Sequence, residues 1–406
     1  MLSIISLSSK SFLFPFLSLS SKNLSFIPAK NQKKQKKTHT RLMSPATELH
    51  GSFLSRLSFR RSQIVSMDVN HEQQLQELEY FQNHVSERFS EFISPSPPSD
   101  PVLSIPWLRN LLHVFISCET EFKEVLPTTA QISKTPSLEK ALSEMLDRIL
   151  KSLDICNAVV NGIESVKKSR RLAEIAVTAL KQRPLCSGSV RRAKRALASL
   201  LVSLNADVKD RTTGGSSRRR TTSRSWSFGQ RSSHVSKNWS AAKQIQAMVA
   251  NLVPPRGAEA MPVYIMSSVM VLVMWVLVAA VPCQTSSVPV APLQLPKHQS
   301  WGSNAVNVQE RVGEEVKGKE KRGGGLMEEM QRMESVGLSL MEFTERFRFP
   351  GEEEEEEEVE EKVDEMDEIC RRMEVGLEDL QRQVRAVFQR LVRIRLEIVS
   401  VLDLNL

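Results

Sequence analysis

The 406-residue chain has few of the residues that β-rich proteins need. It contains only 16 glycines, 2 tyrosines and 5 tryptophans, whereas β-sandwiches and barrels use turn glycines and strand aromatics. Leucine, valine, glutamate, arginine, lysine, serine and methionine dominate instead, and this composition favours helices. With 41% hydrophobic and 25% charged residues, the chain has a globular composition. We therefore expect an all-α protein.

Motifs of catalytic and ligand-binding sites are also missing. The sequence has no GxxxxGK[ST], GxGxxG or GxSxG pattern, so nothing indicates a phosphate loop, a dinucleotide site or a nucleophile elbow. The seven histidines are scattered and are expected to be surface or packing residues. We predict no catalytic, cofactor-binding or metal-binding residues, no cofactor and no enzymatic activity.

The five cysteines form no CxxC pair, which excludes a zinc ribbon or a CxxC redox motif. They have mostly apolar neighbours, so we expect small buried side chains in a reducing compartment. They are Cys118, Cys156, Cys186, Cys283 and Cys370.

The positive charge belongs to one end of the chain. The net charge is +8, but residues 1–42 hold eight Lys/Arg and no Asp or Glu, so the other residues hold 47 basic (55 minus 8) and 47 acidic side chains. A neutral body does not indicate nucleic-acid binding. The segment 218–237, near Trp239, combines arginines with aromatics but has no recognisable fold around it, so no nucleic-acid partner is predicted.

Residues 1–42 form an N-terminal extension, followed by an arm over residues 43–67. The extension is rich in serine and free of acids, which is typical of a transit peptide. Alternatively, Met43 begins a natural-looking start, Met-Ser-Pro-Ala-Thr-Glu, and the extension is an artefact of the gene model. We favour the artefact over plastid targeting and expect translation from Met43 to give a complete folded protein.

Residues 68–205 are predicted to form a helical bundle. Apolar residues recur there at three- and four-residue spacing, which indicates one buried face per helix. The expected helices cover residues 69–93, 106–126, 137–166, 170–180 and 190–204, and proline-containing segments separate several of them. Consecutive helices with short connections are typical of an elongated antiparallel bundle.

Residues 206–239 break this pattern. The stretch 207–240 has eight basic and two acidic residues among many serines and threonines, a net charge of +6. Because it has almost no apolar periodicity, we expect a disordered basic loop that binds an anionic membrane surface. Phosphate on Ser223, Ser225 or Ser227 would weaken that binding.

Residues 240–281 continue the bundle and include an uncharged segment, 263–281, between two prolines. At a rise of about 1.5 Å per residue this segment is roughly 28 Å long, enough to cross a hydrocarbon core. The alternative is the central, all-round apolar helix of a large bundle. The pattern leaves both alternatives open.

Residues 282–325 contain several prolines and glycines and are interpreted as a linker. Residues 326–406 follow, with an acidic run at Glu352–Glu358 and one long C-terminal helix up to about residue 402. Its apolar positions alternate steps of four and three from Val359 to Val401, which predicts a heptad seam. The acidic run is interpreted as a solvated helix start, and we expect the seam to pack against the N-terminal helices.

Several motifs resemble the plant BYPASS-related proteins of the ROH type. They are GSFL at 51–54, VSMD at 65–68, ELEYFQ at 77–82, RLAEIA at 171–176, VRRAK at 190–194, RSWSFG at 224–229, WSAAKQIQAM at 239–248, VPPRG at 253–257 and MWVLVAA at 274–280. The resemblance implies a non-enzymatic plant protein that binds exocyst subunits. It also implies a single membrane span at the hydrophobic segment 263–281.

We therefore expect an adaptor or regulator of membrane trafficking that is cytosolic and membrane-associated. The alternative is a membrane-anchored signalling or metabolic regulator that controls production of a small-molecule signal. A buried polar cluster would favour the alternative, because a scaffold needs none.

Overall fold

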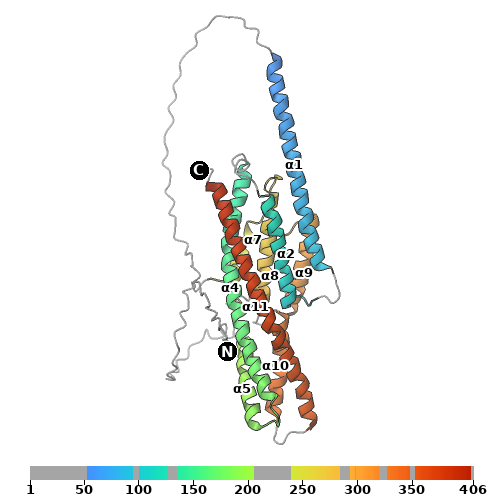
Figure 1. The fold of residues 1–406 in the computed structure, drawn as a ribbon, viewed down its shortest axis with the longest axis vertical. Helices are drawn as coiled ribbons and strands as arrows, with labels where there is room; N and C mark the ends of the chain where they lie inside the picture. The colour runs from blue at the N-terminus through green and yellow to red at the C-terminus, as the bar shows by residue number, and fades with distance from the viewer. Residues whose placement is uncertain are drawn as a thin grey trace, which may run out of the picture. The chain divides into compact units, whose positions relative to one another are not determined.

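The computed structural model describes residues 53–94, 100–126, 135–204, 239–283, 293–297, 299–319, 327–347 and 353–403. Over these ranges it contains nine helices and no strand (Figure 1), which confirms the all-α prediction. The chain divides into two units, residues 1–59 and 60–406. Of the first unit only the beginning of α1 is described.

The first three helices are α1 (Phe53–Ile93), α2 (Ile105–Glu124) and α4 (Pro136–Leu180). The Ser104 side chain accepts a hydrogen bond from the Trp107 N–H at 3.3 Å, which fixes the start of α2. α4 is one continuous helix, so the expected division into 137–166 and 170–180 was wrong. The intervening residues Val-Lys-Lys-Ser-Arg contain neither proline nor glycine, and nothing interrupts the helix there.

Four helices follow: α5 (Ser187–Leu204), α7 (Ala241–Ala250), α8 (Met261–Ala280) and α9 (Ser300–Lys319). α9 lies in the segment that was expected to be a linker, so that interpretation was wrong for residues 300–319. Trp301, Ala305, Val308 and Val312 are buried and recur at three- and four-residue spacing, which gives α9 an apolar face. The Trp301 ring meets the edge of Tyr264 on α8, with 6.2 Å between ring centroids.

The C-terminal region forms two helices, α10 (Glu328–Arg346) and α11 (Glu353–Asp403), and not the single helix that was predicted. Pro350-Gly351 lies between them in sequence, and both residues disfavour helix continuation. The predicted heptad seam is confirmed: its positions from Val359 to Ile398 are buried. α11 packs against α4, α2 and α10, so the expected pairing of the seam with N-terminal helices is also confirmed.

α4 and α11 run antiparallel and side by side, because Lys181 pairs with Asp364 and Lys167 with Glu378. The first part of α4 contacts α7 and α8, and the last part of α11 contacts α2. α8 also contacts α2 and α9, and the end of α1 contacts α2 and α9. We call these elements together the α8 section. The remaining parts of α4 and α11 pack with α5 and α10; we call this the α5 section. Figure 1 shows α5 and α10 at one end of the two long helices and α2, α7 and α8 at the other.

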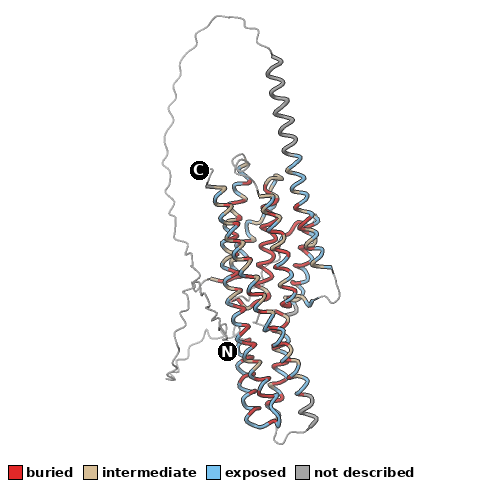
Figure 2. Tube along the Cα trace, in the orientation of Figure 1, coloured by how far each residue is buried: buried red, intermediate tan, exposed pale blue. Residues whose placement is uncertain are grey.

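One apolar core runs through both sections. Buried residues follow the inner faces of α4 and α11 along their described lengths, as Figure 2 shows. The end of α1 joins this core in the α8 section, where Phe81 lies 6.1 Å from Phe122 and Phe92 lies 4.9 Å from Trp107 between ring centroids. A continuous core makes the two sections parts of one folding unit.

Candidate functional site

In the ranges that the structure describes, no group of three or more His, Cys, Asp or Glu side chains is arranged to hold a metal ion. The polar features of the described residues are buried contacts between helices and charged surfaces.

The predicted hydrophobic segment forms α8, which lies against α2, α4, α7 and α9. Of its most apolar 18-residue window, 94% is buried inside the protein. Met274 illustrates the packing, because its sulfur lies 4.0 Å from the Cys156 sulfur on α4. By length and composition α8 is still able to cross a bilayer. Its burial among four helices is the arrangement that the core-helix alternative predicts.

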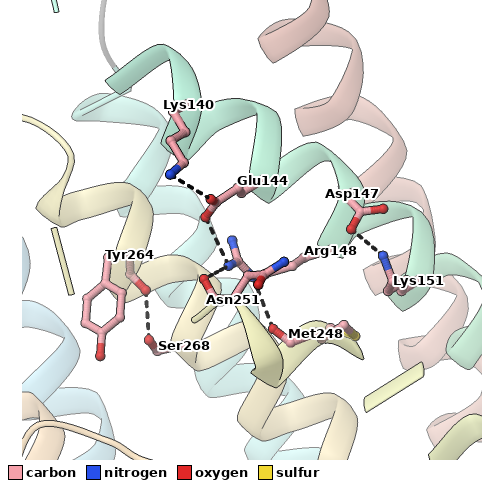
Figure 3. A network of polar contacts seen from close by, with 9 residues as sticks. All are labelled: Lys140, Glu144, Asp147, Arg148, Lys151, Met248, Asn251, Tyr264 and Ser268. Atoms are coloured by element: carbon pink, nitrogen blue, oxygen red, sulfur yellow. Dashed lines mark hydrogen bonds and ion pairs between the residues drawn. The ribbon is translucent and has the colours of Figure 1, made fainter. Parts of the chain in front are cut away.

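A buried arginine fastens α7 to α4 (Figure 3). Arg148 donates to the Asn251 carbonyl at 2.6 Å and to the Met248 carbonyl at 3.3 Å, both at the C-terminal end of α7. Glu144, one turn earlier on α4, lies 3.3 Å from the guanidinium and balances its charge. A helix end leaves carbonyls without partners within the helix, so Arg148 caps α7 and orients it beside α8.

A second polar cluster joins α4 to α11. The ammonium of Lys167 lies 2.6 Å from Glu378 and 2.8 Å from the Gln381 side-chain oxygen. The Gln381 amide in turn donates to Glu164 at 2.6 Å. This hydrogen bond, together with Lys167, lowers the pKa of Glu164. The cluster helps to fix the register of the two long helices, because Gln381 both accepts from Lys167 and donates to Glu164.

A third cluster joins α2 to the end of α11. Glu119 is fully buried and is paired with Arg390, and its second oxygen lies 3.3 Å from Lys123. Lys123 also lies 3.4 Å from Glu397 on α11. A buried carboxylate without a cation is strongly destabilising, and Arg390 and Lys123 together offset the burial of Glu119.

These clusters test the expectation that a buried polar cluster would favour a regulator over an adaptor. Buried polar groups are present, although an adaptor was expected to need none. Each cluster, however, links two helices through cation–carboxylate or cation–carbonyl contacts, and this structural role accounts for it. The criterion therefore does not separate the adaptor from a regulator with a ligand pocket.

The two sections meet where α2 and α10 begin and α8 ends. The Glu329 carboxylate on α10 accepts from the Ile105 N–H at 2.8 Å and so caps α2. The Met327 N–H donates to the Ala280 carbonyl at 3.0 Å, which joins the start of α10 to the end of α8. Burial raises the pKa of Glu329 to about 7. Its other oxygen is buried without a hydrogen-bond partner among the described residues.

Two glycines let helix ends approach at this junction. A Cβ atom on Gly162 of α4 would lie 2.6 Å from the Pro282 carbonyl oxygen, just after α8. A Cβ atom on Gly376 of α11 would lie 2.9 Å from the Ile105 Cγ2 atom. Real Cβ atoms do not come this close to other heavy atoms, so both positions require glycine for the observed packing.

The cysteine prediction is confirmed for four residues. Cys118, Cys156, Cys283 and Cys370 are buried, and burial raises the pKa of the Cys118 thiol to about 12. Cys186 differs, because it is exposed just before α5. Hydrogen bonds from Ser189 lower its pKa. Of the histidines, His84 is buried beside Ser117 at 3.4 Å, consistent with the predicted packing role.

The outer surface of α4 and α5 carries a set of exposed cations that the sequence patterns did not single out. We call it the basic face. Its members are Lys168, Arg171, Arg191, Arg192 and Arg195. Arg191 and Arg192 belong to the VRRAK motif, and the absence of any acid from α5 is readable from the sequence.

Three predicted features lie outside the described residues. They are the N-terminal extension 1–42, the basic loop over 206–238, and the side chains of the acidic run. The helical backbone does begin at Glu353, within that run. This agrees with its interpretation as a helix start.

The fold and its polar contacts define an all-α bundle, and comparison with known proteins places it in a family. Residues 44–402 match the family described as "Protein ROH1-like", so the chain belongs to this family. The predicted ROH-type, BYPASS-related resemblance is thereby confirmed.

Two Arabidopsis thaliana relatives show how far the similarity extends. Protein ROH1A is 50% identical over 89% of this chain and 98% of its own length. Protein ROH1D is 33% identical over 87% of this chain and 97% of its own length. No solved structure matches the chain.

Proposed function

We propose that this ROH1-like protein is a non-enzymatic adaptor of membrane trafficking that binds an exocyst subunit. The observation that carries the proposal is a family match over residues 44–402, which includes every described helix from α2 to α10 and nearly all of α11. The function is that of the ROH-type family which the sequence motifs resemble. Its site of action is the cytosol and the cytosolic surface of membranes.

The fold supports this proposal through its surfaces. Long antiparallel helices present continuous faces to solvent, and such faces bind helices of partner proteins through exposed apolar side chains set among charges. α10 and α11 have such positions, for example Leu338 and Val375, which are exposed. The buried polar clusters hold the helices in register and so keep these surfaces rigid for binding.

Direct binding of purified proteins tests the proposal. The full chain, shown to be helical by circular dichroism, is titrated against each purified exocyst subunit in calorimetry. Saturable binding to at least one subunit is expected. If a folded chain binds none of them, the adaptor proposal is wrong. A variant with Leu338→Asp and Val375→Asp, both on the surface, shows whether the α10–α11 surface contributes to subunit binding.

A further inference from the structure

The basic face has an unusual charge pattern. α5 contains no Asp or Glu, and α4 has one acid after Glu164, Glu174, which pairs with Arg170. Lys168, Arg171, Arg191, Arg192 and Arg195 are all exposed. None of them makes an ion pair or side-chain hydrogen bond within the part of the chain that the structure describes. Five cations thus lie on one pair of helices without a counter-charge.

Helix geometry places these cations on the outward sides of two neighbouring helices. The Ser169 and Ser203 hydroxyls lie 2.9 Å apart, so α4 and α5 are antiparallel neighbours. Arg191, Arg195 and Val202 recur at spacings of four and seven, and form one stripe of α5. This stripe lies opposite the buried stripe of Ala193, Leu197 and Leu200. Lys168, Arg171 and Ile175 form the corresponding stripe on α4.

Some cations elsewhere on the surface give a contrast, although Arg385 and Arg393 of α11 are also exposed without an ion pair within the described residues. Arg371, Arg372 and Arg382 on α11 are exposed, yet each lies within 3 Å of a carboxylate, at 2.7, 2.6 and 2.9 Å. Lys194 on α5 turns toward α10, where it lies 3.4 Å from Glu345. Unpaired like charges in close proximity repel one another and do not help folding. The unpaired cations of the basic face are therefore available to bind an anion from outside the chain.

Two exposed apolar side chains favour a lipid bilayer over an acidic peptide as the source of the anion. Ile175 is 41% exposed and Val202 is 57% exposed, and both lie on the cationic stripes. An acidic peptide needs cations alone, whereas a bilayer interface takes cations at its headgroups and apolar side chains just below them. Guanidinium groups also match phosphate oxygens in a bidentate arrangement.

We propose that the basic face of α4 and α5 binds the anionic surface of a lipid bilayer. The arginines contact headgroup phosphates while Ile175 and Val202 enter the interface. This is peripheral binding by the folded bundle, so α8 stays buried. The proposal goes beyond the exocyst proposal and does not depend on it, because the two assays use different ligands.

The test is flotation of the full-length protein with vesicles made of equal parts phosphatidylcholine and phosphatidylserine. Each arginine near such a surface contributes about fivefold in affinity, so Arg191→Gln/Arg192→Gln/Arg195→Gln should lose roughly a hundredfold. The matched control is Arg371→Gln/Arg372→Gln/Arg382→Gln on α11, which removes the same charge and should retain wild-type binding. Val202→Asp should also weaken binding.

Other outcomes overturn the proposal. Equal losses in both triple variants mean that net charge alone, and not this face, governs binding. Equal binding of wild type to pure phosphatidylcholine vesicles, unchanged by salt, means insertion of an apolar helix. If vesicles do not bind but a poly-glutamate peptide binds in a manner that requires Arg191, Arg192 and Arg195, the face binds an acidic protein segment. Circular dichroism of each variant confirms that it remains folded.

Discussion

The α8 section and the α5 section are built on the same two long helices but solve different packing problems. In the α8 section one helix is surrounded by α2, α4, α7 and α9, so it has no solvent face and is apolar on all sides. In the α5 section each helix keeps an outer face, so α5 alternates buried Ala193, Leu197 and Leu200 with exposed arginines. The number of neighbours of a helix decides how much polarity its sequence carries.

Buried polar groups in the α8 section and at the junction satisfy helix ends. A helix terminus that lies in the core has backbone groups that need partners from other helices. Arg148 supplies them for α7, and Glu329 does so for α2. α5 has more access to solvent, and its unpaired charges point outward.

The largest loss of stability is expected from a charge placed at the centre of α8. Met270→Arg would bury an unpaired cation, because Met270 is fully buried. We expect a loss of more than about 4 kcal/mol and cooperative unfolding of both sections, since they share α4 and α11. Thermal melts followed by circular dichroism measure this. Val202→Arg, on the exposed side of α5, is the control and should be nearly neutral.

A membrane span makes the opposite forecast for Met270→Arg. The variant would then leave the membrane fraction while its other helices keep their melting temperature. Carbonate extraction of the wild type gives an independent answer, because a peripheral bundle is released into the supernatant and a spanning protein is retained. Retention with a protease-shielded C-terminus would rule out the single bundle.

The junction between the sections should be sensitive to pH through Glu329. Its pKa in the folded protein is about 7, above the ordinary value of 4.5. Its protonated form therefore stabilises the fold fully below pH 4.5, and this contribution, about 3 kcal/mol, is lost as the pH rises through 7. Glu329→Gln keeps an acceptor for the Ile105 N–H and should unfold with a flatter pH dependence. Denaturant titrations across this range measure it. Identical pH profiles for variant and wild type would contradict the assignment.

Replacing helix glycines with alanine is expected to change stability by a smaller amount. The change should be a loss at Gly162 and a gain at Gly337. Gly162→Ala pushes a Cβ atom against the Pro282 carbonyl oxygen, which the backbone cannot easily move, so we expect a loss of about 1–3 kcal/mol. Gly337→Ala in the α5 section meets its nearest atoms at an ordinary 3.6 Å. It should gain about 0.5–1 kcal/mol from helix propensity. Urea denaturation of both variants checks the signs, and a stabilised Gly162→Ala would show that α8 does not end there.

The smallest expected effect concerns surface charge in the α5 section. Replacing Arg195 with Gln removes like-charge repulsion without breaking any ion pair, so stability should stay equal or rise by about 0.5 kcal/mol or less. Arg372→Gln breaks a 2.6 Å pair with Glu368 and should lower stability by a similar amount. The two melting temperatures should therefore shift in opposite directions. A loss for Arg195→Gln would mean that a partner for it exists within the fold.

The features readable from the sequence were those that depend on periodicity. The seam of α11 and the all-round apolar character of α8 follow directly from residue spacing, and both were predicted. α9 was not predicted because the prolines and glycines of residues 282–325 indicated a linker, although Trp301, Ala305 and Val308 follow helical spacing. The pairing of Arg148 with the end of α7, or of Glu119 with Arg390, was not predictable, because it depends on contacts between residues at least 100 positions apart. The basic face was not predictable for the same reason, since only the fold shows which arginines have partners.

The packing of α11 against α2 and α4 has a consequence for the growing chain on the ribosome. Glu119 is separated by 271 residues from Arg390, its partner on α11. At about 5–20 residues per second, this interval lasts roughly 14–54 seconds. Throughout it, the inner faces of α2 and α4 lack the helix that covers them, and α8 is made while that groove is still open. α11 is synthesised after the other described helices and completes both sections, so until it emerges the chain exposes apolar surface of the kind that favours aggregation.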